Sequence, residues 1–208
     1  MRPQTALPTL HAHSVIGIVN RGEAALRFIR GVAEYNARFN TFLKTAAIYT
    51  AKEERSPFVK LADRRVSFEE LSGFPGTASS PYLDHDLILE ALEKAGCDAL
   101  WVGWGFVSED APFAKKAEGK GLVFLGPTSA AMALLGDKIA AKDLAETAQV
   151  PILPWSKGAV ESLEDASRVS EEIGYPVIVK ASNAGGGRGI RFVLTPEELS
   201  LQYKSAVD

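Results

Sequence analysis

Short apolar runs alternate with amphipathic stretches over the first two-thirds of the chain. Residues 14–19 (SVIGIV), 44–49 (KTAAIY), 98–103 (DALWVG) and 122–126 (LVFLG) are short and mostly apolar, with little polar alternation. Runs of this kind are typical of strands that are buried on both faces of a parallel sheet. Because helical patterns separate them, we predict βαβ units that form a doubly wound α/β domain.

The predicted helices have recognisable faces and ends. After residues 20–23 (NRGE), apolar side chains recur at i, i+3, i+4 and i+7 from Ala25 to Val32, which is the spacing of one helix face. Asp84 is a candidate cap for the helix that follows it, and Gly96 is its expected stop. Further helices are expected in the segments 109–121, 129–136 and 137–149. The segment 51–83 is less regular, and we predict loop there with one short helix around residues 58–62.

The pattern changes after residue 149. Residues 150–158 (VPILPWSKG) contain two prolines, which argues against a helix, so we expect a linker over 150–160. A helix over 160–174, two strands at 175–182 and 189–194, and a helix that begins at Pro196 follow. About 50 residues are few for an independent core, so this second unit is expected to be incomplete.

The predicted domain organisation therefore has four parts. They are a disordered leader at 1–13, an N-terminal doubly wound domain at 14–149, a linker at 150–160, and the first part of a second α+β subdomain at 161–208.

Composition narrows the classes of partner. The formal net charge is −3, with 46% hydrophobic and 24% charged residues, so neither nucleic acid nor an anionic membrane is an expected partner. No apolar run approaches the roughly 20 residues that a membrane span needs. Cys97 is the one cysteine, which excludes disulfides within the chain and thiolate zinc clusters. With no recognisable targeting pattern at the start, we expect a cytoplasmic protein.

The stretch VIVKASNAGGGRGI, residues 177–190, carries the strongest chemical signal. Gly185, Gly186, Gly187 and Gly189 can adopt positive φ and turn several backbone N–H groups toward one anion. Strands are predicted on both sides of this loop, whereas a Walker loop runs from a strand into a helix. A glycine hairpin over phosphates fits this arrangement, and a flexible β-turn would explain the glycines equally well.

Lys180 adds weight to the phosphate interpretation. It shares a predicted strand face with Ile178 and Ser182, and a partly buried ammonium group is costly unless an anion or another acceptor meets it. Arg188 lies in the adjacent loop. We therefore predict that Lys180 contacts phosphate. The alternative is a lysine that extends into water from an exposed edge.

A polar group follows the first predicted strand, where doubly wound folds bind ligands. Asn20, Arg21 and Glu23 lie on this turn, but a helix cap and a salt bridge would account for them as well. The turn lacks GxGxxG, so a dinucleotide-dependent oxidoreductase is disfavoured.

Other chemical candidates are weaker. Lys138 begins a predicted helix, where a lysine is ordinarily just solvated. Trp101 and Trp104 flank a glycine turn and are expected to serve packing. His11 and His13 could chelate a metal, but we expect no role for them in a leader.

Four segments in order resemble the biotin carboxylases, a family of ATP-grasp ligases. They are VIGIVNRGEAALRFIR, GWGFVSED, FLGPTSAAMALLGDKIAAK and YPVIVKASNAGGGRGIRFV, and the resemblance covers residues 14–208. It implies a Rossmann-like pre-ATP-grasp domain with a doubly wound parallel sheet, followed by a truncated α+β ATP-grasp lid subdomain.

The resemblance also implies roles for particular residues. Lys138 resembles the family lysine near the nucleotide at the start of the lid, and Lys180 resembles the lysine on the α- and β-phosphates. The loop from Gly185 to Gly189 resembles the glycine loop of the lid. Asn183 and Ala184 replace part of a longer glycine run, which implies a slightly stiffer lid. The expected nucleotide-binding residues are Lys138, Lys180, Gly185, Gly186, Gly187, Arg188 and Gly189.

The family's activity is the carboxylation of biotin with bicarbonate and MgATP. The resemblance implies ATP, Mg²⁺ and carrier-bound biotin as cofactors, with the magnesium ligands and catalytic residues beyond Asp208. No catalytic base or metal ligand is therefore assigned, and the chain by itself is not expected to turn over. Expected partners are the rest of the carboxylase polypeptide, including biotin carrier and carboxyltransferase domains, and a homo-oligomer at full length.

Within the family, the chain is most similar to multidomain acetyl-CoA carboxylases. Trp101 and Val102 precede GWGFVSE, where bacterial biotin carboxylase subunits and pyruvate carboxylases usually carry His-Pro, and QVPILPWS (149–156) has the acetyl-CoA carboxylase form. The alternatives are a pyruvate- or propionyl-CoA-type carboxylase, another ATP-grasp ligase, and a non-catalytic nucleotide-binding module. The NRGEAALR segment argues against ATP-grasp ligases of the carbamoyl-phosphate or purine type.

Overall fold

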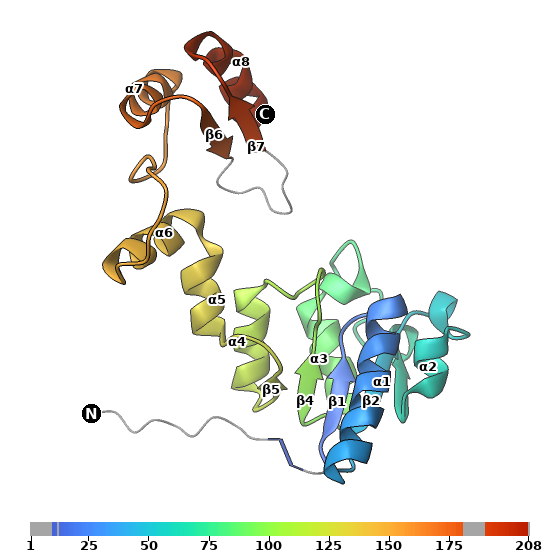
Figure 1. Cartoon of the computed structure of the whole chain (residues 1–208). Coiled ribbons are helices and arrows are strands. Elements are labelled where there is room, and N and C mark those ends of the chain that lie inside the picture. The colour runs from blue at the N-terminus through green and yellow to red at the C-terminus, as the bar shows by residue number, and fades with distance from the viewer. Residues whose placement is uncertain (1–9, 12, 181–189, 208) are drawn as a thin grey trace. The chain divides into compact units, whose positions relative to one another are not determined.

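The chain forms two compact units, residues 1–133 and 134–208, and the division falls inside α5 (Ser129–Gly136). The computed structural model describes residues 10, 11, 13–180 and 190–207 (Figure 1). The domain bounds expected from the sequence, with a linker at 150–160, stay a prediction.

The first unit contains a five-stranded sheet in the order β3-β2-β1-β4-β5, in which every neighbouring pair is parallel. Ile16 lies opposite Thr45 on one side and Ala99 on the other, so β1 is central. The doubly wound parallel sheet predicted from the apolar runs is confirmed. Its strands are β1 (Val15–Ile18), β2 (Lys44–Tyr49), β3 (Arg64–Ser67), β4 (Ala99–Trp101) and β5 (Val123–Phe124).

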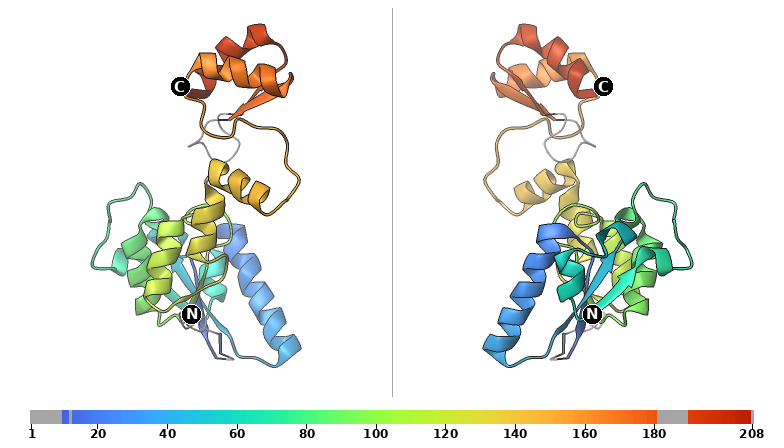
Figure 2. Two further views of the ribbon diagram at one scale, coloured as in Figure 1. Left: turned by 90° about the vertical axis from the view of Figure 1, so that its left-hand side faces the viewer. Right: turned by 90° about the vertical axis from the view of Figure 1, so that its right-hand side faces the viewer.

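Helices cover both faces of this sheet (Figures 1 and 2). On one face α1 (Gly22–Phe39) and α2 (Pro57–Leu61) pack on side chains such as Ile18 and Ala47. On the other face α3 (His85–Lys94) and α4 (Ala111–Gly119) pack on a larger core. Burial of these apolar faces is what holds the helices against the sheet.

The centre of the sheet depends on one close approach. Gly17 lies in β1, and a Cβ atom placed on it would come within 2.0 Å of Cδ2 of Leu92 on α3. The absence of a side chain at Gly17 therefore lets α3 pack directly on the strand.

The segment 51–83 is more regular than predicted. It forms α2 as expected, but also the edge strand β3 and three 3₁₀ helices, η1 (Ala51–Glu53), η2 (Phe68–Glu70) and η3 (Pro81–Leu83). The prediction of loop was wrong for β3, because a short edge strand with two exposed arginines shows no apolar run.

The second unit is small. It contains α6 (Lys138–Thr147), α7 (Leu163–Ile173), an antiparallel hairpin of β6 (Val177–Lys180) and β7 (Ile190–Val193), and α8 (Pro196–Val207). Its core is Ala166, Val193 and Leu199, with half-buried side chains around them. Among the helices described in either unit, none is long and apolar enough to cross a membrane.

Candidate functional site

Asn20 joins the ends of two neighbouring strands in the first unit. It follows β1, is 4% exposed, and its Nδ2 donates to the carbonyls of Val102 at 2.7 Å and Trp104 at 3.0 Å. Its Oδ1 accepts from the N–H of Arg21 at 2.8 Å. Asn20 therefore locks the loop after β4 onto the end of β1. This is the point where strand order reverses, and where doubly wound sheets bind ligands.

A hydrogen-bonded carboxylate lies beside this turn. Nη1 of Arg21 is 3.2 Å from Oε1 of Glu53, and the hydroxyl of Tyr82 is 2.9 Å from Oε2 of the same group. Burial raises the pKa of Glu53, but hydrogen bonds from Thr50, Tyr82 and Arg21 outweigh it and hold that pKa below its ordinary value. A satisfied, ionised carboxylate of this kind supports structure, which agrees with the salt bridge considered for the NRGE turn. The cap considered there was wrong, because α1 begins at Gly22 without a side-chain cap hydrogen bond.

The two tryptophans at the end of β4 and in the loop after it differ in exposure. Trp101 stacks on Phe28, with ring centroids 4.4 Å apart, so its expected packing role is confirmed. Trp104 is 60% exposed, between Gly103 and Gly105 at φ 63° and 72°, so the packing prediction was wrong for it. Glycines on both sides of an aromatic residue are the sequence signal that could have indicated an exposed loop tip.

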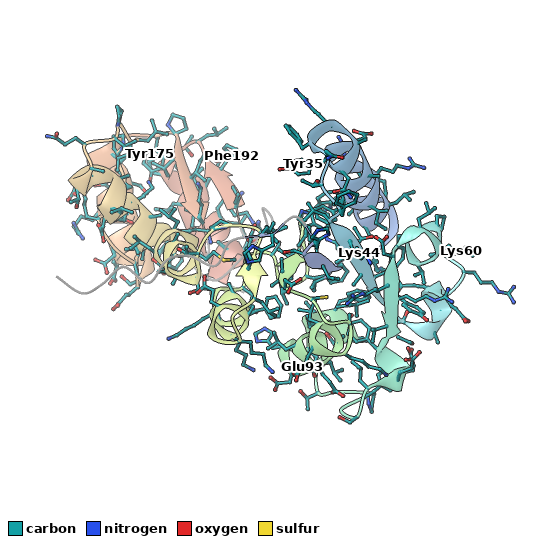
Figure 3. All side chains as sticks on the ribbon, turned by 90° about the horizontal axis from the view of Figure 1, so that it is seen from below. Tyr35, Lys44, Lys60, Glu93, Tyr175 and Phe192 are labelled. Carbon is teal, nitrogen blue, oxygen red and sulfur yellow. The ribbon has the colours of Figure 1, made fainter. Side chains whose placement is uncertain are left out.

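An apolar hollow of about 950 Å³ lies on the α1 side of the same sheet. Phe28, Tyr35, Trp101, Trp104 and Leu125 are among its lining residues, and Tyr35 can be located in Figure 3. All of its lining residues belong to the first unit, whereas Lys138 and Lys180 belong to the second.

Lys138 is the first residue of α6, in the second unit. Asp137 caps this helix and accepts from the N–H groups of Ile139 at 2.9 Å and Ala140 at 2.8 Å. Lys138 is exposed. Its position in the first helical turn is as predicted, and its proposed contact with nucleotide remains a prediction.

Lys180 is the last residue of β6 and lies opposite Ile190 of β7. Val177 and Val179 pack on the core formed with α7 and α8, whereas Ile178 and Lys180 are exposed. The shared face with Ile178 is confirmed, but the partial burial expected for Lys180 was wrong. A two-stranded hairpin has two faces, and the core with α7 and α8 covers only the other one.

The exposed face of the hairpin, formed by Ile178, Lys180, Ile190 and Phe192, is apolar apart from its lysine. Phe192, labelled in Figure 3, is 67% exposed, and Ile178 and Ile190 are 48% and 39% exposed. The other predicted phosphate ligands, Gly185, Gly186, Gly187, Arg188 and Gly189, lie outside the described residues, as does Ser182. The described part of the predicted site thus consists of Lys138 and Lys180.

A further cationic group was missed by sequence reasoning. On α6, Nζ of Lys142 lies 5.2 Å from the ring centroid of Trp155, and Nζ of Lys157 lies 5.7 Å from the same ring. Glu146 accepts hydrogen bonds from Nε1 of Trp155 and from Lys157. No local motif joins these positions. Lys142 and Glu146 share a helix spacing of i, i+4, but Trp155 comes from the segment after it.

Metal-binding chemistry is not evident in the part of the chain that the structure describes. No group of three or more His, Cys, Asp or Glu side chains there could hold a metal ion.

Comparisons with known proteins give this geometry its context. The family model described as "Biotin carboxylase, N-terminal domain" matches residues 12–132. The chain belongs to the biotin carboxylase family. The model described as "Carbamoyl-phosphate synthase L chain, ATP binding domain" matches residues 137–208.

Sequence similarity to individual carboxylases supports the same family assignment. The chain is 39% identical to the biotin carboxylase of Pseudomonas aeruginosa over 183 residues, which cover 88% of this chain and 38% of that protein. It is 39% identical to the human mitochondrial propionyl-CoA carboxylase alpha chain over 181 residues, covering 87% of this chain and 23% of that protein. The chain thus spans about two-fifths or less of these relatives.

Solved biotin carboxylase structures have the same fold. The Campylobacter jejuni biotin carboxylase in complex with β-γ-ATP superposes with a TM-score of 0.80 at 37% identity, covering 93% of this chain and 41% of that one. The biotin carboxylase domain dimer of Hydrogenobacter thermophilus 2-oxoglutarate carboxylase, solved with MgADP, ADP and bicarbonate, gives 0.80 at 36%, covering 95% and 41%. The predicted resemblance to the biotin carboxylases and the predicted fold class are confirmed. The family's use of ATP, Mg²⁺, bicarbonate and biotin is confirmed as well.

Proposed function

We propose that this chain provides the nucleotide-phosphate contacts of an ATP-dependent biotin carboxylase. The observation that carries the proposal is Lys180 on the open face of the β6–β7 hairpin, in a chain whose relatives include a biotin carboxylase solved with an ATP analogue. Because the ammonium group of Lys180 is exposed, it can contact a phosphate, and the folded chain carries no desolvation cost for burying it beforehand. Lys138 at the start of α6 would supply a second cation.

In this proposal the chain acts by positioning and charge neutralisation. Phosphoryl transfer requires compensation of negative charge on the phosphate oxygens, and lysine ammonium groups supply it as point charges. MgATP, when bound, would activate bicarbonate for the carboxylation of biotin. Lysine ammonium groups suit phosphate oxygens, which supports this role. We also propose that the magnesium ligands come from other parts of the enzyme, as the resemblance to the family implies.

The acyl acceptor is proposed to be acetyl-CoA. Trp101 and Val102 before GWGFVSE, and the QVPILPWS segment, support this assignment. Relatives that act on 2-oxoglutarate, propionyl-CoA and pyruvate, by their names, keep those acceptors as alternatives. We propose that the parent enzyme is cytoplasmic and homo-oligomeric, and works with biotin carrier and carboxyltransferase domains.

Equilibrium titration with ATP tests the phosphate role. Lys180→Ala is expected to weaken binding at least tenfold, as for loss of one charged hydrogen bond of about 1.5–3 kcal/mol. Lys204→Ala is the matched control, because Lys204 is an exposed lysine on α8 of the same unit. Equal affinity for the two variants would refute the proposal.

A kinetic measurement tests the extent of the activity. The 208-residue chain is expected to show no biotin-dependent ATP hydrolysis, because no catalytic base is assigned in it. Hydrolysis that rises with added biotin would contradict this. ATP binding without any stimulation, even when the remaining carboxylase domains are supplied, would favour a non-catalytic nucleotide-binding module.

A further inference from the structure

Two lysines and one indole form a cationic group in the second unit. Lys142 of α6 and Lys157 both lie over the ring of Trp155, at 5.2 and 5.7 Å from its centroid. Each contact is within the range of a cation–π interaction. The indole therefore gathers two positive charges from different segments of the chain.

The nearby negative charge does not balance this group. Oε1 of Glu146 accepts from Nε1 of Trp155 at 2.9 Å, and it also accepts from Lys157, with which it forms an ion pair. Lys142 makes no ion pair with a carboxylate within the described residues. Its ammonium group is held by the ring of Trp155 instead.

Lys180 adds a further positive charge to this group. Partial burial lowers the pKa of Lys142, and the next largest cause is the charge of Lys180, followed by an opposing effect of Glu146. The side chain of Lys142 is half-buried. Two ammonium groups that repel each other are stabilised when an anion binds both, and Lys142 forms no ion pair within the described residues that would already offset its charge.

We propose that Lys142 is a further phosphate-binding residue, which shares a chain of two or more phosphates with Lys180 and is held in position by the indole of Trp155. This inference rests on the proposed function, in which Lys180 binds nucleotide phosphates. A single phosphate would satisfy one ammonium group, whereas a di- or triphosphate presents several anionic oxygens to cations from separate elements, here α6 and β6. Trp155 acts as a positioning residue, since it contacts the lysine and not the ligand.

Binding of three probes to the full 208-residue chain tests the proposal. ADP, inorganic pyrophosphate and adenosine are titrated calorimetrically against the wild type, Lys142→Met, Lys142→Arg and Lys180→Met. Lys204→Met is the control for loss of a lysine elsewhere in the same unit. Lys142→Met is expected to weaken ADP and pyrophosphate binding about tenfold, the effect of one charged contact, with adenosine unaffected. Lys142→Arg keeps the charge and should restore most of the affinity.

The outcomes separate this inference from the proposed function. Full affinity for ADP in Lys142→Met, with loss in Lys180→Met, overturns the role of Lys142 and leaves the proposed function standing. Pyrophosphate binding that depends on Lys142, without ADP binding by the wild type, supports the anion site and counts against the nucleotide. Failure of the wild type to bind either probe overturns both.

The positioning role of Trp155 has its own readout. Trp155→Leu removes the aromatic face and is expected to weaken pyrophosphate binding as Lys142→Met does, while Trp155→Phe keeps a ring and should restore it. Phenylalanine has no Nε1, so recovery would exclude the hydrogen bond to Glu146 as the cause. Equal weakening in both variants, at unchanged melting temperature, would overturn the positioning role.

Discussion

The hydroxyl group of Tyr82 lies 2.9 Å from Oε2 of Glu53 and 2.9 Å from the carbonyl oxygen of Ile48. It thereby ties η3 to η1 and to β2, three elements that are separate in the sequence. Burial, together with the charge of Glu53, raises the pKa of Tyr82, so the hydroxyl stays protonated and remains a donor.

Tyr82→Phe is expected to destabilise the chain by about 1–3 kcal/mol, because it removes the hydroxyl that bonds the buried carbonyl of Ile48 and the carboxylate of Glu53. The ring itself, which packs on Phe68 with centroids 5.0 Å apart, is retained. Denaturant-induced unfolding measures the change. Tyr35→Phe is the control, since Tyr35 is 48% exposed and should shift stability by less than about 0.5 kcal/mol. Equal effects of the two variants would show that the buried hydroxyl contributes nothing.

Two glycines of the first unit should respond to alanine with opposite signs. Gly17→Ala places a Cβ 2.0 Å from Cδ2 of Leu92, a fully buried side chain, so we expect a loss of about 1–3 kcal/mol. Gly31 lies within α1 with nothing inside 4 Å of the added atom, and Gly31→Ala should stabilise by about 0.5–1 kcal/mol. Thermal unfolding of both variants checks the pair. A stable Gly17→Ala protein would mean that α3 can move away from the sheet.

Acid should weaken the start of α3 through Asp84. Its side chain accepts from the N–H of Thr77 at 2.8 Å and from those of Asp86 and Leu87 at 3.1 Å, and these bonds lower its pKa. A lowered carboxyl pKa contributes stability above the unfolded value of about 3.9, which is lost as the pH falls through the folded value. The stability difference between the wild type and Asp84→Ala should therefore shrink from pH 7 toward acid. A constant difference across that range would contradict the assignment.

Cys97 should be unreactive while the first unit is folded. Burial raises the pKa of its thiol to about 12, so little thiolate exists at neutral pH. Its labelling by iodoacetamide is expected to be slow in buffer and fast in concentrated guanidinium chloride, where one thiol per chain should react. Mass spectrometry measures the rate. Rapid labelling in buffer, at a pH where the unit is shown to be folded, would count against the burial of this side chain.

Much of the first unit could be predicted from its sequence because its signals are local. The strand at residues 44–49 was placed at its observed bounds, and the cap at Asp84 was identified, since each depends on a few neighbouring residues. The strand Arg64–Ser67 was not, because an edge strand with two exposed arginines has no apolar run, and only its pairing with β2 defines it. Trp104 shows the same limit, since identical residue types at 101 and 104 differ in exposure only through the path of the backbone.

In the candidate site, too, some features could be predicted from the sequence, whereas others depended on the tertiary structure. The order of motifs identified the family, and the strand pattern placed Lys180 on the face of Ile178. Its exposure was decided only by the tertiary structure, in which the α7–α8 core covers one face of the hairpin and leaves the other open. The meeting of Lys142 with Trp155 was likewise beyond the sequence, because it depends on how the segment after α6 returns along that helix. Periodicity and capping act between residues a few positions apart, whereas burial and charge clustering depend on distances that only the folded chain sets.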